Sequence, residues 1–389
     1  MIVAGRCLGV LFRHIGQPPV IGEVVAGILL GPSLLGRVTP GAYLYLLPPE
    51  IAPFLSVLAQ LGVIVYMFLV GLELNSDLLR GQVHASVATS HASIVLPFIL
   101  GSALALYLYP VMAPGDVPFT HFALFLGIAM SITAFPALAR ILADQGMTGS
   151  RLGVLALTCA AVDDMTAWCL LAFVVGVVHA TGESALLVAV LTVSFIAVMF
   201  LAVRPFFERL VASPAGMGPT QGAFAIALIA MLASALVTEA IGVHAIFGAF
   251  LLGAVIPNDS ELARSLRQSG ELVVVLFLPA FFAFTGMRTE MSLVSGVYEW
   301  SICALIVFVA TAGKFGGTVV AARASGLDWR HAAGLGVLMN TRGLMELIVL
   351  NVGLDLGVIS PTLFTMTVLM ALATTVATTP ILRRLVPEP

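Results

Sequence analysis

Charged side chains are scarce in this sequence. Only 10% of the 389 residues are Asp, Glu, Lys or Arg, whereas 60% are hydrophobic. Soluble domains carry about 25% charged residues, because a soluble protein needs a polar coat. The composition therefore excludes a large soluble protein and predicts an all-α polytopic membrane protein. The formal net charge of −3 provides no basic surface for nucleic acid, so we expect no nucleic-acid partner.

Cysteine is also rare, and none of the four cysteines is spaced for a metal site. Cys7, Cys159, Cys169 and Cys303 all lie in apolar segments, so we interpret them as core residues and expect no disulfide. The first residues, "MIVAGRCLGVLFRH", lack a basic start and a cleavage site, so no signal peptide is expected. No cofactor is expected either.

Apolar runs long enough to cross a bilayer, about 20 residues each, recur along the whole chain. We predict about thirteen transmembrane helices in one transporter domain over residues 1–385, followed by a short cytoplasmic tail, 386–389. The first predicted helix is short for a complete crossing. The predicted spans are 1–14, 18–36, 51–72, 83–109, 119–143, 152–179, 184–207, 220–238, 241–256, 270–287, 296–323, 331–353 and 360–385.

The placement of arginine supports this map, because cytoplasmic loops are enriched in basic residues. Every second loop carries arginine, whereas the opposite loops hold only Arg37 and Arg288. The alternation predicts a multi-pass cell-membrane protein with a cytoplasmic C-terminus and, for an odd number of spans, an outside N-terminus. The arginines on the predicted cytoplasmic side are Arg13, Arg80, Arg140, Arg151, Arg204, Arg209, Arg264, Arg267, Arg323, Arg330, Arg383 and Arg384.

Two of the predicted spans carry interruptions. The fifth, "GIAMSITAFPALARIL", contains Pro136, which removes a backbone donor, and the hydroxyls of Ser131 and Thr133 directly before it. The twelfth, "GVLMNTRGLMELIVLNVG", holds a polar group at Asn340–Gly343. One such span is as well explained by a simple kink, since membrane helices tolerate proline.

The two interrupted spans stand seven spans apart, so they cross the membrane in opposite directions. Interrupted helices at matching positions of two inverted halves indicate a substrate site near the midplane of the membrane. We therefore predict inverted repeats over residues 1–179 and 220–385, joined by a connector helix, 184–207, with the two broken helices crossing.

Two adjacent carboxylates, Asp163 and Asp164, lie in the apolar sixth span, in "CAAVDDMTAW". A charged residue at the bilayer centre costs at least about 2.5–3.5 kcal/mol, so such residues are rare and usually functional. Neighbouring helical positions point about 100° apart. One of these carboxylates can therefore pair with a cation of the protein while the other faces a cavity.

The partner expected for one carboxylate is Lys314, which is the single lysine of the chain and lies deep in the eleventh span. Its neighbours Gly313, Gly316 and Gly317 allow close approach of another helix. A purely structural Lys–Asp pair is the alternative interpretation. Arg342 and Glu346, four residues apart, are expected to form an intrahelical pair or to take part directly in the transport pathway.

Together these features predict a proton/cation exchanger rather than an enzyme. Oxygen ligands suit protons and small hard cations, and a loaded, neutralised site crosses a dry barrier more cheaply than a bare carboxylate pair. The alternatives are a sodium-coupled organic-anion symporter of the same fold, an intramembrane aspartyl protease and a channel. A protease needs its two carboxylates on different helices, and a channel needs no titratable pair.

The sequence resembles the monovalent cation:proton antiporter-2 family, which has the sodium/proton antiporter fold. The stretches that carry the resemblance are "QPPVIGEVVAGILLGPSLLG", "VYMFLVGLEL", "SITAFPALARILAD", "CAAVDDMTAWCLLAF", "TEAIGVHAIFGAFLLGAVIP", "GKFGG" and "NTRGLMELIVLNVGLDLGVIS". The resemblance implies a homodimer, with a core domain that moves like an elevator against a dimerisation domain in the lipid bilayer.

The resemblance also implies residue roles. Asp164 matches the ion-binding aspartate, Asp163 matches the aspartate that pairs with the core lysine, here Lys314, and Thr133 falls on the unwound part of the first broken helix. Ser131 is expected to contribute beside Thr133. Members with both aspartates and the lysine are expected to be electrogenic. The transported ions are expected to be protons and Na⁺ or K⁺, with Li⁺ possible, and no metal is expected beyond the transported cation.

Overall fold

A computed structural model describes residues 1–73, 83–179, 184–212 and 221–386. The described chain is helical throughout and divides into two compact units. Predicted loop residue Arg80 and the last three residues of the predicted tail lie outside the described residues.

The first unit contains the two interrupted spans. It includes α9 (Arg151–His179) as far as Leu171 and the end of α14 (Glu261–Met287) from Phe282. Its other helices are α1 (Ile2–His14), α2 (Pro19–Leu30), α3 (Leu35–Val38), α4 (Pro40–Leu46), α6 (Val83–Met112), α7 (Phe119–Ser131), α8 (Phe135–Asp144), α15 (Val297–Ala324), α16 (Trp329–Met339), α17 (Leu344–Asp355) and α18 (Pro361–Leu385), with short 3-10 turns at η1 (Pro49–Ile51) and η4 (Met291–Leu293).

The second unit contains the remaining parts of α9 and α14 together with five helices and a π-helical turn. These are α5 (Ala52–Glu73), α10 (Ser184–Val198), η3 (Met199–Val203), α11 (Arg204–Ala212), α12 (Gln221–Ile241) and α13 (Ala245–Val255). Within this unit α5 and α13 cross at Gly71 and Gly253. A Cβ at Gly71 would lie 2.2 Å from the Phe250 carbonyl oxygen, so only glycine allows this approach.

Ten helices of the described chain are long and apolar enough to cross a membrane, or eleven if the bent pair α16–α17 counts as one span. The predicted spans 1–14 and 241–256 correspond to α1, with 13 residues, and to α13, with 11 residues, and both are shorter than a full crossing. The count of thirteen therefore stays a prediction. Helix α14 begins at Glu261, so Arg264 and Arg267 lie in a helix and not in the loop where the sequence placed them.

Helix starts follow from capping residues and proline. Proline is tolerated in the first turn of a helix, where its missing N–H has no intrahelical partner. Pro136 occupies that position in α8, and Pro361 does so in α18. The Asp328 carboxylate accepts hydrogen bonds from the backbone N–H groups of Arg330 and His331 at the start of α16.

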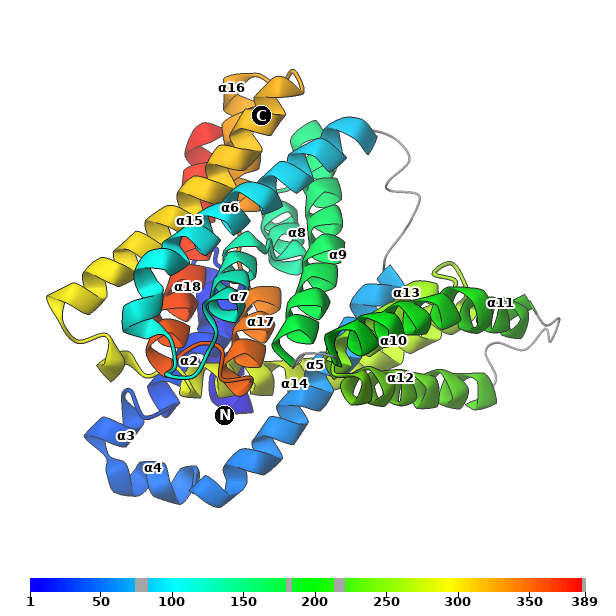
Figure 1. Cartoon of the computed structure of the whole chain (residues 1–389), viewed down its shortest axis with the longest axis horizontal. Helices are drawn as coiled ribbons and strands as arrows, with labels where there is room; N and C mark the ends of the chain where they lie inside the picture. The colour runs from blue at the N-terminus through cyan, green and yellow to red at the C-terminus, as the bar shows by residue number, and fades with distance from the viewer. Residues whose placement is uncertain (74–82, 180–183, 213–220, 387–389) are drawn as a thin grey trace. The chain divides into compact units, whose positions relative to one another are not determined.

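The predicted interruptions are present in both spans. The first broken span ends α7 at Ser131 and restarts as α8 at Phe135, and the second is broken between α16 and α17, which are bent by 43°. Figure 1 shows α7 and α17 inside the first unit with α6, α15 and α18 around them. The breaks therefore lie within this unit and away from its surface.

Helix α6 packs against α7 and α15. Glycine permits the α6–α15 contact, because a Cβ at Gly313 would lie 2.8 Å from the Pro97 Cα, and one at Gly317 would lie 2.6 Å from the Ala92 carbonyl oxygen. Gly316 differs from the sequence-based expectation, since nothing lies within 4 Å of its Cβ position. Two of the three glycines beside Lys314 therefore serve helix approach.

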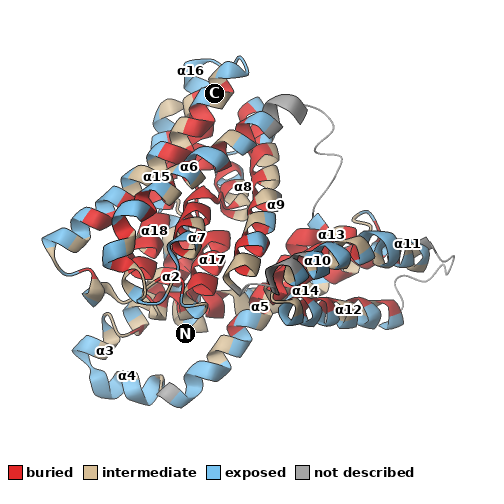
Figure 2. Ribbon diagram, in the orientation of Figure 1, coloured by how far each residue is buried: buried red, intermediate tan, exposed pale blue. Residues whose placement is uncertain are grey.

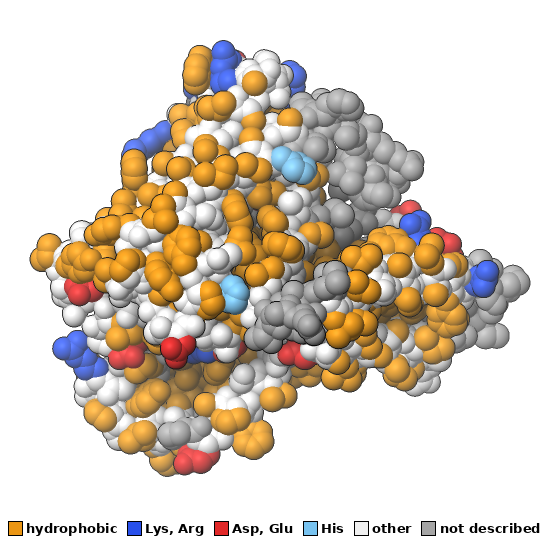
Figure 3. All heavy atoms as spheres, in the orientation of Figure 1, with side chains coloured by type: hydrophobic (Ala, Val, Ile, Leu, Met, Phe, Trp, Pro, Cys, Tyr) orange, Lys and Arg blue, Asp and Glu red, His pale blue; other side chains and the backbone are white. Residues whose placement is uncertain are grey.

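Burial and charge are distributed as a membrane protein requires. The buried residues of the first unit gather on α7, α17 and α18 (Figure 2), and 78% of the most apolar window in 119–144 is buried. Figure 3 shows apolar side chains covering α6 and α15, with basic side chains at the α16 end. The first unit thus combines an apolar outer face with polar groups inside it.

Candidate ion-binding site

The breaks of the two interrupted spans meet inside the first unit. The Thr133 hydroxyl donates to the Met339 carbonyl at 2.9 Å, and the Ala134 N–H donates to the Thr341 carbonyl at 2.9 Å. A broken helix leaves backbone groups without intrahelical partners. Here, donors of the first break bind backbone carbonyls of the second break. Thr133 is 0% exposed and lies in the unwound segment, as the sequence predicted.

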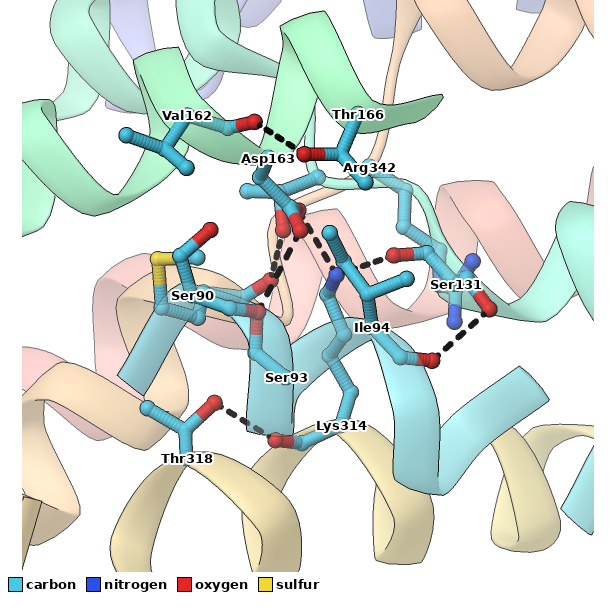
Figure 4. Close-up of polar contacts among 12 residues, drawn as sticks. Ser90, Ser93, Ile94, Ser131, Val162, Asp163, Thr166, Lys314, Thr318 and Arg342 are labelled. Carbon is cyan, nitrogen blue, oxygen red and sulfur yellow. Dashed lines mark hydrogen bonds and ion pairs between the residues drawn. The ribbon is translucent and has the colours of Figure 1, made fainter. Parts of the chain in front are cut away.

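Asp163 and Lys314 form an ion pair beside this crossing. The Lys314 Nζ lies 2.8 Å from Asp163 Oδ2, and both side chains are 0% exposed. The ammonium also donates to the Ser131 carbonyl at the end of α7 (Figure 4). The pair that the sequence predicted is thus present, and the lysine connects α15 to both α9 and the first break.

Ser93 of α6 also contacts this pair, although it was not among the residues predicted for the site. Its hydroxyl lies 3.4 Å from Asp163 Oδ1, the carboxylate oxygen that Lys314 does not bind. A signal was available in the sequence. Thr89, Ser90 and Ser93 are closely spaced hydroxyl residues in an otherwise apolar span, and all three are buried.

Asp164 points to a different partner from Asp163. Its carboxyl group interacts electrostatically with the backbone N–H of Phe135, the first residue of α8. A helix N-terminus carries partial positive charge, which stabilises an anion there. The residue is 3% exposed, and its Oδ1 has no hydrogen-bond partner among the described residues. Asp164 therefore offers one free carboxylate oxygen at the first break.

Arg342 lies in the second break and binds the end of α7. Its guanidinium donates to the carbonyls of Ala129 and Met130 at 2.9 and 2.8 Å, and to Glu346 Oε2 at 2.9 Å. Arg342 and Glu346 are both 0% exposed. The predicted intrahelical pair is present, and its arginine also joins the two broken spans.

Two cations therefore neutralise one helix end. The C-terminus of a helix carries partial negative charge and unpaired carbonyls. At the end of α7 these carbonyls are bound by Lys314 and Arg342, which come from α15 and from the second break. This arrangement fixes the position of the first break relative to both elements.

The remaining polar side chains of the breaks differ in how they are engaged. The Ser131 hydroxyl has two acceptors within reach, the carbonyls of Gly127 at 2.7 Å and Ile94 at 3.1 Å, and its one proton donates to one of them at a time. Its lone pairs remain available for a cation. The Thr375 hydroxyl accepts a hydrogen bond from the Arg342 N–H and donates one to the Arg342 carbonyl. Asn340 Oδ1 is buried and has no partner in the described part of the chain.

The charges of the site do not cancel. Asp163, Asp164 and Glu346 are three potential anions, and Lys314 and Arg342 are two cations. If all five are ionised, one negative charge is left in a region that excludes water. A single proton or monovalent cation restores neutrality. Asp164 Oδ1 and Glu346 Oε1 are both buried carboxylate oxygens without a partner among the described residues, but Glu346 is already paired with Arg342 through its other oxygen. Within the same residues Asp164 has no such cation, so its Oδ1 is the oxygen better placed to hold that proton or cation.

Comparisons with known proteins identify the family of the chain. A family model described as "Sodium/hydrogen exchanger, transmembrane" matches residues 2–386. The chain is 45% identical to Na(+)/H(+) antiporter NhaS4 of Synechocystis sp., over 100% of this chain and 96% of that protein. It is 39% identical to Cation/H(+) antiporter 17 of Arabidopsis thaliana, over 98% of this chain but only 47% of the plant protein.

A solved structure shares the fold. The sodium proton antiporter MjNhaP1 from Methanocaldococcus jannaschii, determined at pH 8, superimposes with a TM-score of 0.73. The match covers 98% of this chain and 94% of that structure, at 13% sequence identity. At this identity the likeness shows the fold alone.

Proposed function

Since the chain belongs to the sodium/hydrogen exchanger family, whose model spans residues 2–386, we propose that it is a secondary active antiporter. It exchanges protons for a monovalent cation, Na⁺ or K⁺, across a membrane. The cyanobacterial relative is named for Na⁺/H⁺ exchange and the Arabidopsis relative for cation/H⁺ exchange. The function needs no covalent chemistry and no cofactor, because the transported ions are themselves the substrates.

The observation that carries the proposal is the free carboxylate oxygen of Asp164 at the first break. A carboxylate oxygen binds either a proton or a hard cation, but not both at once. Competition for one oxygen couples the two ions, because the cation enters only when the proton has left. Thr133 and Ser131 supply further oxygen atoms at the same break.

Access alternates because only a neutralised site crosses the dry barrier at low cost. With a proton or a cation on Asp164, the five buried ionisable groups balance. Without either, one unbalanced negative charge opposes the movement. This difference prevents the empty carrier from crossing and makes the exchange obligatory.

Lys314 neutralises the charge of Asp163, and the two residues form an ionisable pair in addition to Asp164. We expect electrogenic exchange, because the pair takes up a further proton when Asp164 holds its own, so that more than one proton is exchanged for each monovalent cation. Arg342 and Glu346 have a structural role in this account, since their contacts already engage the end of α7 and each other. They fix the second break against the first.

The larger organisation follows the same proposal. The domain of residues 1–385 consists of inverted repeats over 1–179 and 220–385 with a connector at 184–207. The six spans of the core are α6, α7–α8, α9, α15, α16–α17 and α18, which all contribute to the first unit. We propose a homodimer in the cell membrane, with the N-terminus outside, the C-terminus in the cytoplasm and an elevator-like movement of the core.

A sodium-coupled organic-anion symporter of the same fold is the alternative. A symporter would carry its cation and its anion in the same direction and would show no cation-triggered proton movement. The buried Lys314–Asp163 pair beside a second carboxylate favours proton coupling, because both groups can exchange a proton. The two functions are separated by whether a cation gradient alone moves protons.

The test uses the purified full chain in liposomes that contain a pH-sensitive dye. Adding Na⁺, K⁺, Li⁺ or Rb⁺ to the outside is expected to change the internal pH for at least one of Na⁺ and K⁺. Asp164→Asn is expected to abolish the change, because the amide cannot ionise. Arg384→Ala, at an exposed position near the end of α18, serves as the matched control. Proton flux that persists in Asp164→Asn would contradict the proposed site.

A further inference from the structure

Helix α6 places buried hydroxyl groups against the ion pair. Ser90 and Ser93 are three residues apart on one helix face, and both are 0% exposed. A buried hydroxyl is costly unless it makes a hydrogen bond. The Ser93 hydroxyl contacts Asp163, whereas the Ser90 hydroxyl has no hydrogen-bond partner among the described residues (Figure 4).

The Ser93 hydroxyl has two acceptors within reach. The Ser90 carbonyl lies at 2.8 Å, and Asp163 Oδ1 lies at 3.4 Å. A serine hydroxyl carries one proton, so it donates fully to only one acceptor at a time. The shorter contact goes to the helix carbonyl while Lys314 holds the other carboxylate oxygen at 2.8 Å. Rotation about one side-chain bond would bring the donor to Asp163.

We propose that Ser93 is a positioning residue for the Lys314–Asp163 pair. Its hydroxyl turns from the Ser90 carbonyl to Asp163 when the ammonium and the carboxylate separate, and it then stabilises the ionised carboxylate. The inference rests on the proposed antiport, in which the pair takes part in proton loading. It adds to that function a residue that sets the pH at which the pair exchanges its proton.

Asp163 is already surrounded by charged and titratable groups, so a neutral hydrogen-bond donor can stabilise its carboxylate without changing the charge of the site. Asp164 and Cys159 act on it from its own helix, and Lys314 acts on it from α15. Arg342 and Glu346 act on Lys314 from the second break. On α6 the titratable residue next to Ser90 is His91, which is exposed. Ser93 can therefore compensate Asp163 without adding a charge to the site.

The experiment measures the pH dependence of cation-triggered proton flux in liposomes. Ser93→Ala is expected to shift the profile by about one unit towards alkaline pH. The lost hydrogen bond would stabilise the ionised form of Asp163 by roughly the free energy that corresponds to one pH unit. Ser93→Thr, which keeps the hydroxyl, is expected to restore the profile of the unmodified protein. Ser90→Ala is the matched control, since the Ser90 hydroxyl has no partner among the described residues and its carbonyl is unchanged.

The outcomes separate the two proposals. No cation-triggered flux in the unmodified protein contradicts the antiport function itself. Normal flux with an unshifted profile in Ser93→Ala, or an equal shift in Ser90→Ala, overturns the role of Ser93 alone. If Ser93→Ala does not fold, Ser93→Cys replaces it. A thiol is a weak donor, so an intermediate shift is expected and an unshifted profile contradicts the proposal.

Discussion

Asp163 and Asp164 are adjacent in α9, yet their carboxyl groups are held by different elements. Asp163 is paired with Lys314 of α15 at 2.8 Å, whereas Asp164 interacts electrostatically with the backbone N–H of Phe135 at the start of α8. This division follows from the angle of about 100° between neighbouring helical positions. One aspartate is thereby compensated within the protein, and the other keeps a free oxygen for an ion.

Electrogenic exchange predicts a response to voltage. Moving one net charge across the membrane changes the free energy by about 2.3 kcal/mol per 100 mV. With an inside-negative potential set by a potassium-selective ionophore, Na⁺-triggered proton efflux is expected to be slower than at zero potential, because more than one proton leaves for each Na⁺ that enters. The internal dye reports the rate. Equal rates at potentials of opposite sign would show that the exchange is electroneutral.

Removing the ammonium of Lys314 is expected to destabilise the protein strongly. Lys314→Ala leaves Asp163 buried without its cation, and breaking a buried pair in this way costs about 3–5 kcal/mol. The double variant Lys314→Ala with Asp163→Asn is expected to recover much of the stability, because no buried charge is left unpaired. Thermal unfolding in detergent compares the variants. Equal melting temperatures for the single and the double variant would contradict the pairing.

The contacts of Arg342 predict a graded effect of two substitutions. Arg342→Met leaves the Ala129 and Met130 carbonyls and the Glu346 carboxylate without their donor, so a loss of about 3–5 kcal/mol is expected. Glu346→Gln keeps an acceptor oxygen for the guanidinium and is expected to cost less. Thermal unfolding in detergent compares both variants with the unmodified protein. A larger loss for Glu346→Gln than for Arg342→Met would be inconsistent with these contacts.

The α6–α15 contact predicts different effects for two glycines on one helix. Gly313→Ala puts a Cβ 2.8 Å from the Pro97 backbone and is expected to cost about 1–3 kcal/mol by overpacking. Gly316→Ala meets nothing within 4 Å and is expected to be neutral or to stabilise α15 by up to about 1 kcal/mol. Melting temperatures compare the pair. The reverse order would mean that α6 and α15 do not approach as described.

Much of this site could be predicted from the sequence, because buried charge is rare enough to be informative. A single lysine and an aspartate pair in apolar spans leave few possible partners, and the Lys314–Asp163 contact is present. Proline and adjacent hydroxyls likewise predicted the break at Thr133. Each of these signals involves a few neighbouring residues and reflects a large free-energy cost, either of burying a charge or of interrupting a helix.

The remaining features depend on tertiary distances that no local pattern encodes. Arg342 was expected to reach Glu346 four residues away, but its contacts with Ala129 and Met130 require that the second break lie against α7. Ser93 was missed because serine is common in membrane helices, and its importance appears only when Asp163 lies beside it. Gly316 was grouped with its neighbours although it faces open space.

The most direct test of the account is the proton release that accompanies cation binding. The purified protein in weakly buffered detergent solution is titrated with Na⁺ and with K⁺ over a series of pH values, and a dye reports released protons. Release is expected with at least one of the two cations, with weaker cation binding as the pH falls, and no release is expected in Asp164→Asn. Cation binding without proton release, or unchanged release in Asp164→Asn, would show that the two ions do not compete for this carboxylate.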